Sequence, residues 1–220
     1  MAIAVDAVSA ADSGGANVAS LTWSHTVAAG NERILIVGVS VVVETAATVT
    51  YGGTALTKKT ALQNVDIEAS LWFLVAPPVG AADIVVTFSA AARVVGGATS
   101  YTGVDPTTPW GTAATASGTS TAPSVTVTSA ANELPVDAMA CKGDPVITVG
   151  AGQTQRWNRS SGSGPSLAGS EEPGAASVVL SWSLNPSKVW ALVAAPLKPS
   201  PPFLPPLLRA VPFPNVLLRL

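Results

Sequence analysis

The sequence predicts an all-β protein: an antiparallel double-sheet sandwich of jelly-roll type that ends in an extended, proline-rich C-terminal arm. Short segments of alternating apolar and polar residues recur along most of the 220 residues, and glycine and proline separate them. No apolar pattern keeps a 3.6-residue period over three turns. About ten short strands without crossover helices favour an antiparallel sandwich over a parallel α/β sheet.

The alternation is clearest in DIVVTFS, where Ile84, Val86 and Phe88 share one face of a half-buried strand. PSVTVTS and SVVLSWS repeat this pattern, whereas residues 34–43 are apolar on both faces, as expected of a central strand. Further strands are expected over residues 19–27, 49–51, 56–59, 69–76, 93–101, 133–141, 153–158 and 189–196. The alternation predicts these core side chains: Leu35, Val37, Val39, Leu71, Phe73, Val86, Phe88, Leu180, Trp182 and Leu192.

The chain divides into three predicted parts. Residues 1–17 form an N-terminal segment, residues 18–198 the sandwich, and residues 199–220 the arm. Two stretches rich in Gly, Ser, Thr and Ala, residues 111–123 and 159–174, lack apolar periodicity and are expected to be loops. No repeat with a fixed period of 20 to 50 residues is apparent, which argues against a propeller or a solenoid.

The composition excludes several classes of protein. Only 11% of the residues are charged and the net charge is −2, so we expect no nucleic-acid partner. The longest apolar run, residues 34–43, is too short to span a membrane, and the N-terminus lacks the pattern of a secretory signal. The single cysteine, Cys141, excludes an intramolecular disulfide framework and is expected to be a buried apolar side chain.

The composition changes at Pro196, because eight of the last 25 residues are proline. Proline at this density forbids a regular helix and a central strand, so the arm should run extended. Large apolar side chains lie between the prolines, and we expect them to bind a partner. These residues are Phe203, Leu204, Leu207, Leu208, Val211, Phe213, Val216, Leu217, Leu218 and Leu220.

No pattern of residues predicts an enzyme or a metal site. The single histidine, His25, shares a strand face with apolar residues and lacks a recognisable nucleophile motif, so we interpret it as a hydrogen-bonded strand histidine. Asp66 and Glu68 are the only close carboxylate pair on one strand face, and calcium needs six to eight oxygen ligands. We therefore expect no catalytic activity, no metal and no cofactor.

Two of the six tryptophans, Trp110 and Trp157, lie close to predicted loops. Their side chains are candidates for stacking on a ligand such as a carbohydrate, and the alternative is packing over an edge of the sandwich. The other four tryptophans lie inside predicted strands and are expected to pack in the core.

The succession VTYGGTALTK, LWFLVAPPVGAADIVVTFSA, SYTGVDPTTPW and GAASVVLSWSLNPSKVWALVAAPLKP resembles a poorly characterised class of β-sandwich domains in phage virion proteins and bacterial surface proteins. The resemblance covers residues 18–199 and lies mostly in core strands and turns. It implies the sandwich fold and assigns no functional residue. The proline-rich arm lies outside the resemblance.

The leading hypothesis is a structural virion protein, a capsid decoration or cement subunit of a bacteriophage. Such a subunit is assembled in the host cytoplasm and then exposed on the particle surface, which fits a composition typical of extracellular β proteins without an export signal. Its partners would be the major capsid protein, copies of itself, or both, and we expect a homo-oligomer without membrane contact. Two alternatives remain open: a tail-fibre or surface adhesion module that binds carbohydrate, and an extracellular filament subunit joined by strand exchange.

Overall fold

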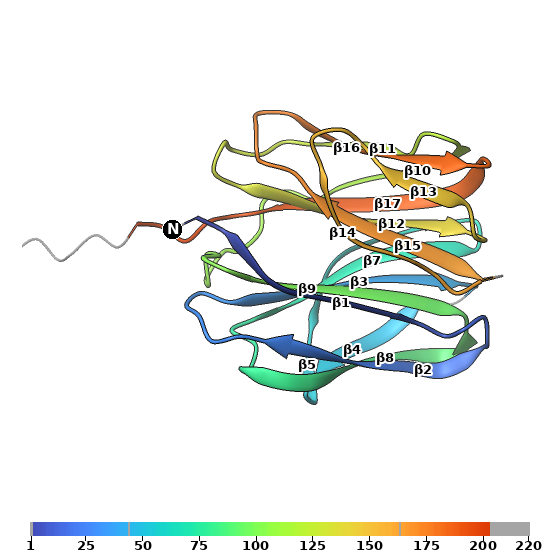
Figure 1. Ribbon diagram of the computed structural model, residues 1–220, viewed down its shortest axis with the longest axis horizontal. Coiled ribbons are helices and arrows are strands. Elements are labelled where there is room, and N and C mark those ends of the chain that lie inside the picture. The colour runs from blue at the N-terminus through green and yellow to red at the C-terminus, as the bar shows by residue number, and fades with distance from the viewer. Residues whose placement is uncertain (1, 44, 163, 203–220) are drawn as a thin grey trace, which may run out of the picture.

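The computed structural model describes residues 2–43, 45–162 and 164–202, and over these residues the chain forms strands and no helix (Figure 1). The N-terminal half contains β1 (Ala4–Asp12), β2 (Val18–Val27), β3 (Ile34–Val42), β4 (Ala46–Tyr51), β5 (Thr54–Ala55), β6 (Thr57–Asn64), β7 (Ile67–Val75), β8 (Gly80–Ala92) and β9 (Val94–Thr102). The C-terminal half contains β10 (Ala114–Ser120), β11 (Ser124–Val127), β12 (Leu134–Lys142), β13 (Val146–Val149), β14 (Thr154–Ser160), β15 (Pro165–Glu171), β16 (Val178–Asn185) and β17 (Lys188–Leu197).

The strands form four antiparallel sheets that stack in layers (Figure 1). The N-terminal half has an inner sheet, β1-β9-β3-β7-β6, and an outer sheet, β2-β8-β4-β5. The C-terminal half has an inner sheet, β10-β17-β12-β15-β14, and an outer sheet, β11-β16-β13. The two inner sheets face one another, and each is covered on its other side by the outer sheet of its own half. The predicted all-β sandwich is therefore confirmed, and it is built twice.

The two halves share one topology. The strands β1, β2, β3 and β4 correspond to β10, β11, β12 and β13, and the strands β6 to β9 correspond to β14 to β17. With this correspondence the inner sheets have the same strand order, and the outer sheets differ only by the two-residue β5. Each half orders its strands as a jelly roll does, except that β6 in one half and β14 in the other lie at the edge of the inner sheet.

The register and the sequence carry traces of the same duplication. A register shift leaves Lys59 unpaired between β6 and β7, and the equivalent shift leaves Arg156 unpaired between β14 and β15. The segments GAADIVVTFS (80–89) and GAASVVLSWS (174–183) share five of ten residues. Both segments enter corresponding strands, β8 and β16, so the chain is a tandem repeat of one sandwich.

The inner sheets meet across an approximate two-fold axis. β3 packs on β12, β7 packs on β12 as β15 packs on β3, and β6 packs on β17 as β14 packs on β9. Each contact therefore has a counterpart with the halves exchanged, as in a symmetric dimer. The duplication gives one chain the architecture of two self-complementary subunits.

Three apolar cores fill the spaces between the four sheets. Eight of the predicted core side chains are buried: Leu35, Val37, Val39, Leu71, Val86, Leu180, Trp182 and Leu192. Phe73 and Phe88 are half-buried. Phe73 lies near the end of β7, where its ring contacts Trp110 edge to face with ring centroids 5.6 Å apart.

The structure corrects the expected loops and differs from the expected N-terminal segment. β1 lies within residues 1–17 and pairs with β9. β10 lies within residues 111–123, and β15 together with the end of β14 lies within residues 159–174. β15 is buried along its whole length because sheets cover both of its faces, so its small residues pack closely and show no alternation.

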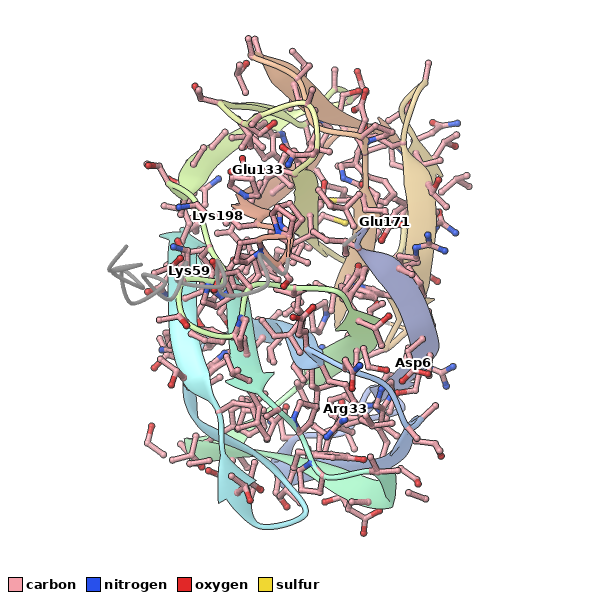
Figure 2. All side chains as sticks on the ribbon, turned by 90° about the vertical axis from the view of Figure 1, so that its left-hand side faces the viewer. Asp6, Arg33, Lys59, Glu133, Glu171 and Lys198 are labelled. Atoms are coloured by element: carbon pink, nitrogen blue, oxygen red, sulfur yellow. The ribbon has the colours of Figure 1, made fainter. Side chains whose placement is uncertain are left out.

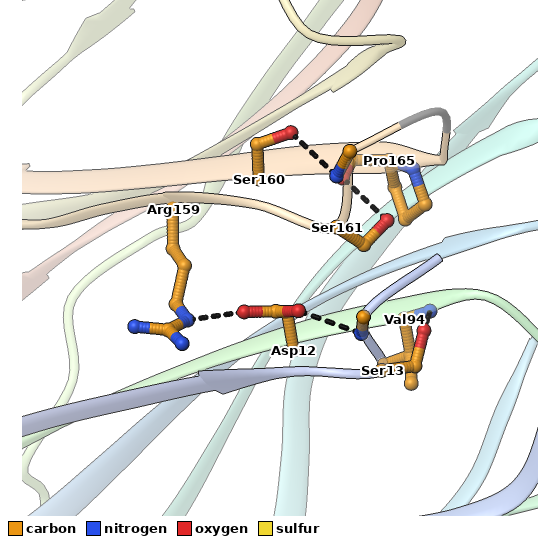
Figure 3. A network of polar contacts seen from close by, with 9 residues as sticks. Asp12, Ser13, Val94, Arg159, Ser160, Ser161 and Pro165 are labelled. Carbon is orange, nitrogen blue, oxygen red and sulfur yellow. Dashed lines mark hydrogen bonds and ion pairs between the residues drawn. The ribbon is translucent and has the colours of Figure 1, made fainter. Parts of the chain in front are cut away.

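Polar contacts also join the two halves. Arg159 in β14 pairs with Asp12 in β1 at 2.5 Å, beside a second Asp12 contact to the backbone N–H of Gly14 (Figure 3). Lys142 pairs with Asp66 at 2.5 Å. Both cations are about half exposed, so each pair adds at most about 1 kcal/mol to the stability. The apolar packing between the inner sheets therefore accounts for most of the attachment between the halves.

Candidate functional site

The ten residues predicted to bind a partner, Phe203 to Leu220, lie outside the described residues. The structure describes the segment from which they continue, residues 198–202, which we call the arm root. The arm root follows β17 and leaves the body at the end of the molecule where residue 2 also lies (Figure 1).

The arm root is attached to the connection between the halves. The backbone N–H of Lys198 donates to the carbonyl oxygen of Pro109 at 2.8 Å, and the backbone N–H of Asp105 donates to the carbonyl oxygen of Lys198 at 2.9 Å. Pro199 then forms an isolated β-bridge with Val104. The arm root thus continues the line of β17 as a short strand against residues 104–109.

Ser200 attaches the arm root to the N-terminal half. Its backbone N–H donates to the carbonyl oxygen of Gly103 at 2.8 Å, and its hydroxyl donates to Oε1 of Glu32 at 2.6 Å. Ser200 is only 5% exposed. Since β17 belongs to the C-terminal half, the last described residues bridge both halves, and the direction in which the chain leaves is determined by the folded body.

Charged groups of both signs surround this end of the molecule. Figure 2 views it and labels Asp6, Arg33, Lys59, Glu133, Glu171 and Lys198. Lys59 donates from Nζ to the carbonyl oxygen of Gly111 at 2.9 Å. Burial lowers the pKa of Lys59, and the nearby charge of Lys198 lowers it further. The backbone N–H groups of Thr108 and Thr107 lower the pKa of Asp105.

A groove opens at the same end, between the two halves. It has a volume of about 400 Å³, and its lining residues are Ala2, Ile3, Ala131, Asn132, Glu133, Leu134 and Pro173. Leu134 pairs with Leu197, the residue that directly precedes the arm root. The groove and the exit point of the arm are therefore neighbours.

Trp110 lies beside the arm root and is half-buried. It forms a β-bridge with Leu197, its ring contacts Phe73, and Nζ of Lys59 lies 5.8 Å from its ring centroid. Trp110 therefore packs over the edge of the central core.

Trp157, the second candidate for ligand stacking, packs inside the protein instead of lying on its surface. Trp157 lies in β14, is 6% exposed and inserts between the inner sheets. Its ring fills a slot whose walls are Gly38, Gly97 and Gly169, where a Cβ atom on Gly97 would lie 2.5 Å from the ring. A ligand cannot stack on a ring that is enclosed in this way.

His25 is a hydrogen-bonded strand histidine, as predicted, and it is 2% exposed. Its Nδ1 lies 2.8 Å from the Ser9 hydroxyl and its Nε2 lies 3.2 Å from the Ser100 hydroxyl. The Ser100 hydroxyl donates to Oδ2 of Asp6 at 2.7 Å. The Ser100 oxygen therefore accepts a hydrogen bond from Nε2–H of His25, and Nδ1 of His25 accepts a hydrogen bond from the Ser9 hydroxyl. Burial lowers the pKa of His25, and the negative charge of Asp6 partly opposes this effect.

This network pairs a serine with a histidine, but its arrangement is structural. Nε1 of Trp23 donates to the Ser9 oxygen at 3.0 Å, which occupies a lone pair that a nucleophile would use. Asp6 accepts from Ser100 and from the backbone N–H of Ala28 at 2.9 Å, so it does not orient the imidazole directly. The network joins β1 to β2 at the side of the N-terminal sandwich.

Sequence reasoning missed a second buried polar group, Asp137 in β12, which is 0% exposed. Its Oδ1 accepts from the N–H of Ser170 at 2.6 Å and from its hydroxyl at 3.0 Å, and its Oδ2 accepts from Nε1 of Trp182 at 2.7 Å. Burial raises the pKa of Asp137 to about 7, although these three hydrogen bonds lower it. The signal in the sequence was a single acid within the apolar strand LPVDAMACK.

A third polar group lies at the seam between the halves. The Tyr101 hydroxyl donates to Oε2 of Glu171 at 2.8 Å, and Arg156 pairs with Oε1 of the same carboxylate. Burial and the negative charge of Glu171 raise the pKa of Tyr101 well above its ordinary value. Tyr101 belongs to β9 and Glu171 to β15, so this group joins the two inner sheets.

Within the described ranges, no three His, Cys, Asp or Glu side chains gather in a way that could hold a metal ion, and no helix could cross a membrane. Comparison of the chain with protein-family models, curated proteins and solved structures found no match. The interpretation of function therefore rests on the residues of this chain.

Proposed function

We propose that the protein is a structural subunit of a phage virion, a capsid decoration or cement protein that docks on neighbouring subunits through its C-terminal arm. The observation that carries this proposal is the attachment of the arm root to both halves of the body. A terminal tail without a function needs no such attachment. An arm that must reach a neighbour benefits from a defined starting point, because less conformational freedom is lost on binding.

The architecture of the body supports the same role. The duplicated sandwich buries one continuous apolar interface between the inner sheets, so the two halves of a single chain are held together as two subunits of a dimer would be. The buried polar groups described above, at His25, Asp137 and Glu171, each tie one sheet to another. These groups stabilise the body, which suits a protein whose role is mechanical. The carbohydrate-binding alternative loses one of its two candidate side chains, because Trp157 is buried.

Truncation after Pro202 tests the proposal, because it removes residues 203–220 and keeps the contacts of Pro199 and Ser200. We expect the truncated chain to melt at the temperature of the full chain and to be absent from virions purified from infected cells. A matched variant replaces the ten apolar residues of the arm by serine and keeps its length and prolines, and it should also be absent. Unchanged incorporation of the truncated chain would contradict the proposal.

A further inference from the structure

We propose that the groove beside the arm root receives the C-terminal arm of a second copy of this chain. This inference rests on the proposed function, since it identifies the surface on which the arm docks. It concerns the groove formed by Ala2 and Ile3 of the N-terminal half and by residues 131–134 and Pro173 of the C-terminal half.

The walls of the groove are held in place before anything binds. The N–H of Gly174 donates to the carbonyl oxygen of Glu133 at 2.9 Å, and the N–H of Glu133 donates to that of Ala130 at 3.0 Å. The Ser129 hydroxyl donates to the carbonyl oxygen of Ala175 at 2.9 Å. Two of these bonds join residues 129–133 to residues 174–175, which follow Pro173, and the Glu133–Ala130 bond closes a turn, so an occupant would bind without rearranging these segments.

The chemistry of the groove complements that of the arm. Five lining side chains are apolar, and Glu133 supplies a carboxylate; the apolar ones are those of Ala2, Ile3, Ala131, Leu134 and Pro173. Residues 203–220 contain ten large apolar residues, two arginines, Arg209 and Arg219, and no acidic residue. An apolar groove with one negative charge therefore suits an apolar segment with two positive charges.

The direction of the arm root favours a neighbour over the chain's own groove. Residues 201–202 point away from the body (Figure 1), and Pro201, Pro202, Pro205 and Pro206 favour continued extension of the chain. No glycine follows Gly174, so the arm lacks the residue that most easily reverses a chain. A return to the groove beside the exit would need such a reversal, whereas a facing copy would not. Because groove and exit lie at one end, two copies can exchange arms reciprocally in a closed pair.

Charge reversal in the groove tests this inference with the full-length chain. Glu133→Arg should weaken self-association at least tenfold in Kd by sedimentation velocity, and the added changes Arg209→Glu and Arg219→Glu should restore it. Asp144→Arg is the matched control, because it makes the same change of charge beyond the opposite end of β12 and should leave the Kd unchanged. A monomeric wild-type chain, or a Kd unaffected by Glu133→Arg, would overturn the inference.

A cross-link then identifies which copy supplies the arm. A photoreactive benzophenone side chain at position 213 is activated in an equal mixture of ¹⁵N-labelled and unlabelled chains. We expect peptides that join the arm of one copy to residues 131–134 of the other, with mixed isotope content. Cross-links within single copies, or to another surface, would refute the exchange. If the arm-truncated chain fails to join virions while Glu133→Arg joins them normally, the proposed function stands and the groove is not the acceptor.

Discussion

Replacement of Gly97 by valine should destabilise the seam between the inner sheets, because Trp157 occupies the space that the new side chain needs. A Cβ atom at this position would lie 2.5 Å from the indole ring, about 1 Å closer than carbon atoms normally approach. The ring cannot retreat, because its other faces rest on Gly169 and Gly38. Overpacking usually costs about 1–3 kcal/mol, and for an enclosed ring we expect a cost of about 3 kcal/mol.

Comparison of the two halves indicates a second substitution that should restore the stability lost in Gly97→Val. The pair Gly38–Gly97 corresponds to Ala138–Val193 in the other half, and the pair Trp157–Gly169 corresponds to Thr60–Leu71. One side of the seam thus combines a tryptophan with glycines, and the other combines a threonine with larger apolar residues. Trp157→Thr alone should cost about 3 kcal/mol through the cavity that it leaves. The double variant Gly97→Val/Trp157→Thr should cost at least about 2 kcal/mol less than the sum of the two single changes.

Thermal and urea unfolding of the four proteins measure this coupling. For a chain of this size, about 3 kcal/mol lowers Tm by roughly 6–12 °C. Gly38→Ala is a graded control, because its Cβ atom would lie 3.1 Å from Trp157 and 3.3 Å from Cβ of Ala138, a smaller overlap than at Gly97, and the variant should lose less stability than Gly97→Val. Additive losses in the double variant would refute the account of the slot.

Three further predictions concern the buried polar groups and the arm root. Burial raises the pKa of Asp137 to about 7, so the protonated carboxyl group favours the folded state. This contribution to stability is fully present below the ordinary aspartate pKa and is lost as pH rises through about 7. Asp137→Asn lacks the titrating group, so the difference in Tm between this variant and the wild type should change between the ordinary aspartate pKa and about pH 7. Burial lowers the pKa of His25, so the wild type should lose stability as pH falls below 6.5, and His25→Leu should lack this loss in the same melting series. Ser200→Ala removes the hydrogen bond to Glu32, so amide hydrogen exchange should become faster at Lys198 and Ser200, the two residues of the arm root with a backbone N–H, while the Tm falls by at most a few degrees.

Strands with clear alternation could be predicted from the sequence. In β8, Ile84 and Val86 are buried, whereas Asp83 is exposed and Val85 and Thr87 are half-buried. β3 is buried along almost its whole length because both of its faces are covered. β15 could not be recognised from the sequence, since its small residues are typical of a loop. These residues form a strand here because sheets cover both faces of β15. Its environment depends on packing between distant parts of the chain.

The duplication had a signal in the sequence, the matching segments 80–89 and 174–183, but their separation exceeds the periods of common repeats. The environment of Trp157 had no local signal, because Gly38, Gly97 and Gly169 come from three different strands. The partners of Asp137 likewise lie in β15 and β16, and their approach depends on the register of the sheets. Groups assembled across sheets in this way become visible only in the folded structure.

The central claim is that the arm connects this subunit to its neighbours in a virion. An image of the assembled particle at residue resolution tests it most directly, because the arm can be followed from Pro202 onward. We predict density for residues 203–220 on a neighbouring subunit, with apolar side chains buried against it. An arm that lies on the body of its own chain, or a particle that lacks this protein, would contradict the claim.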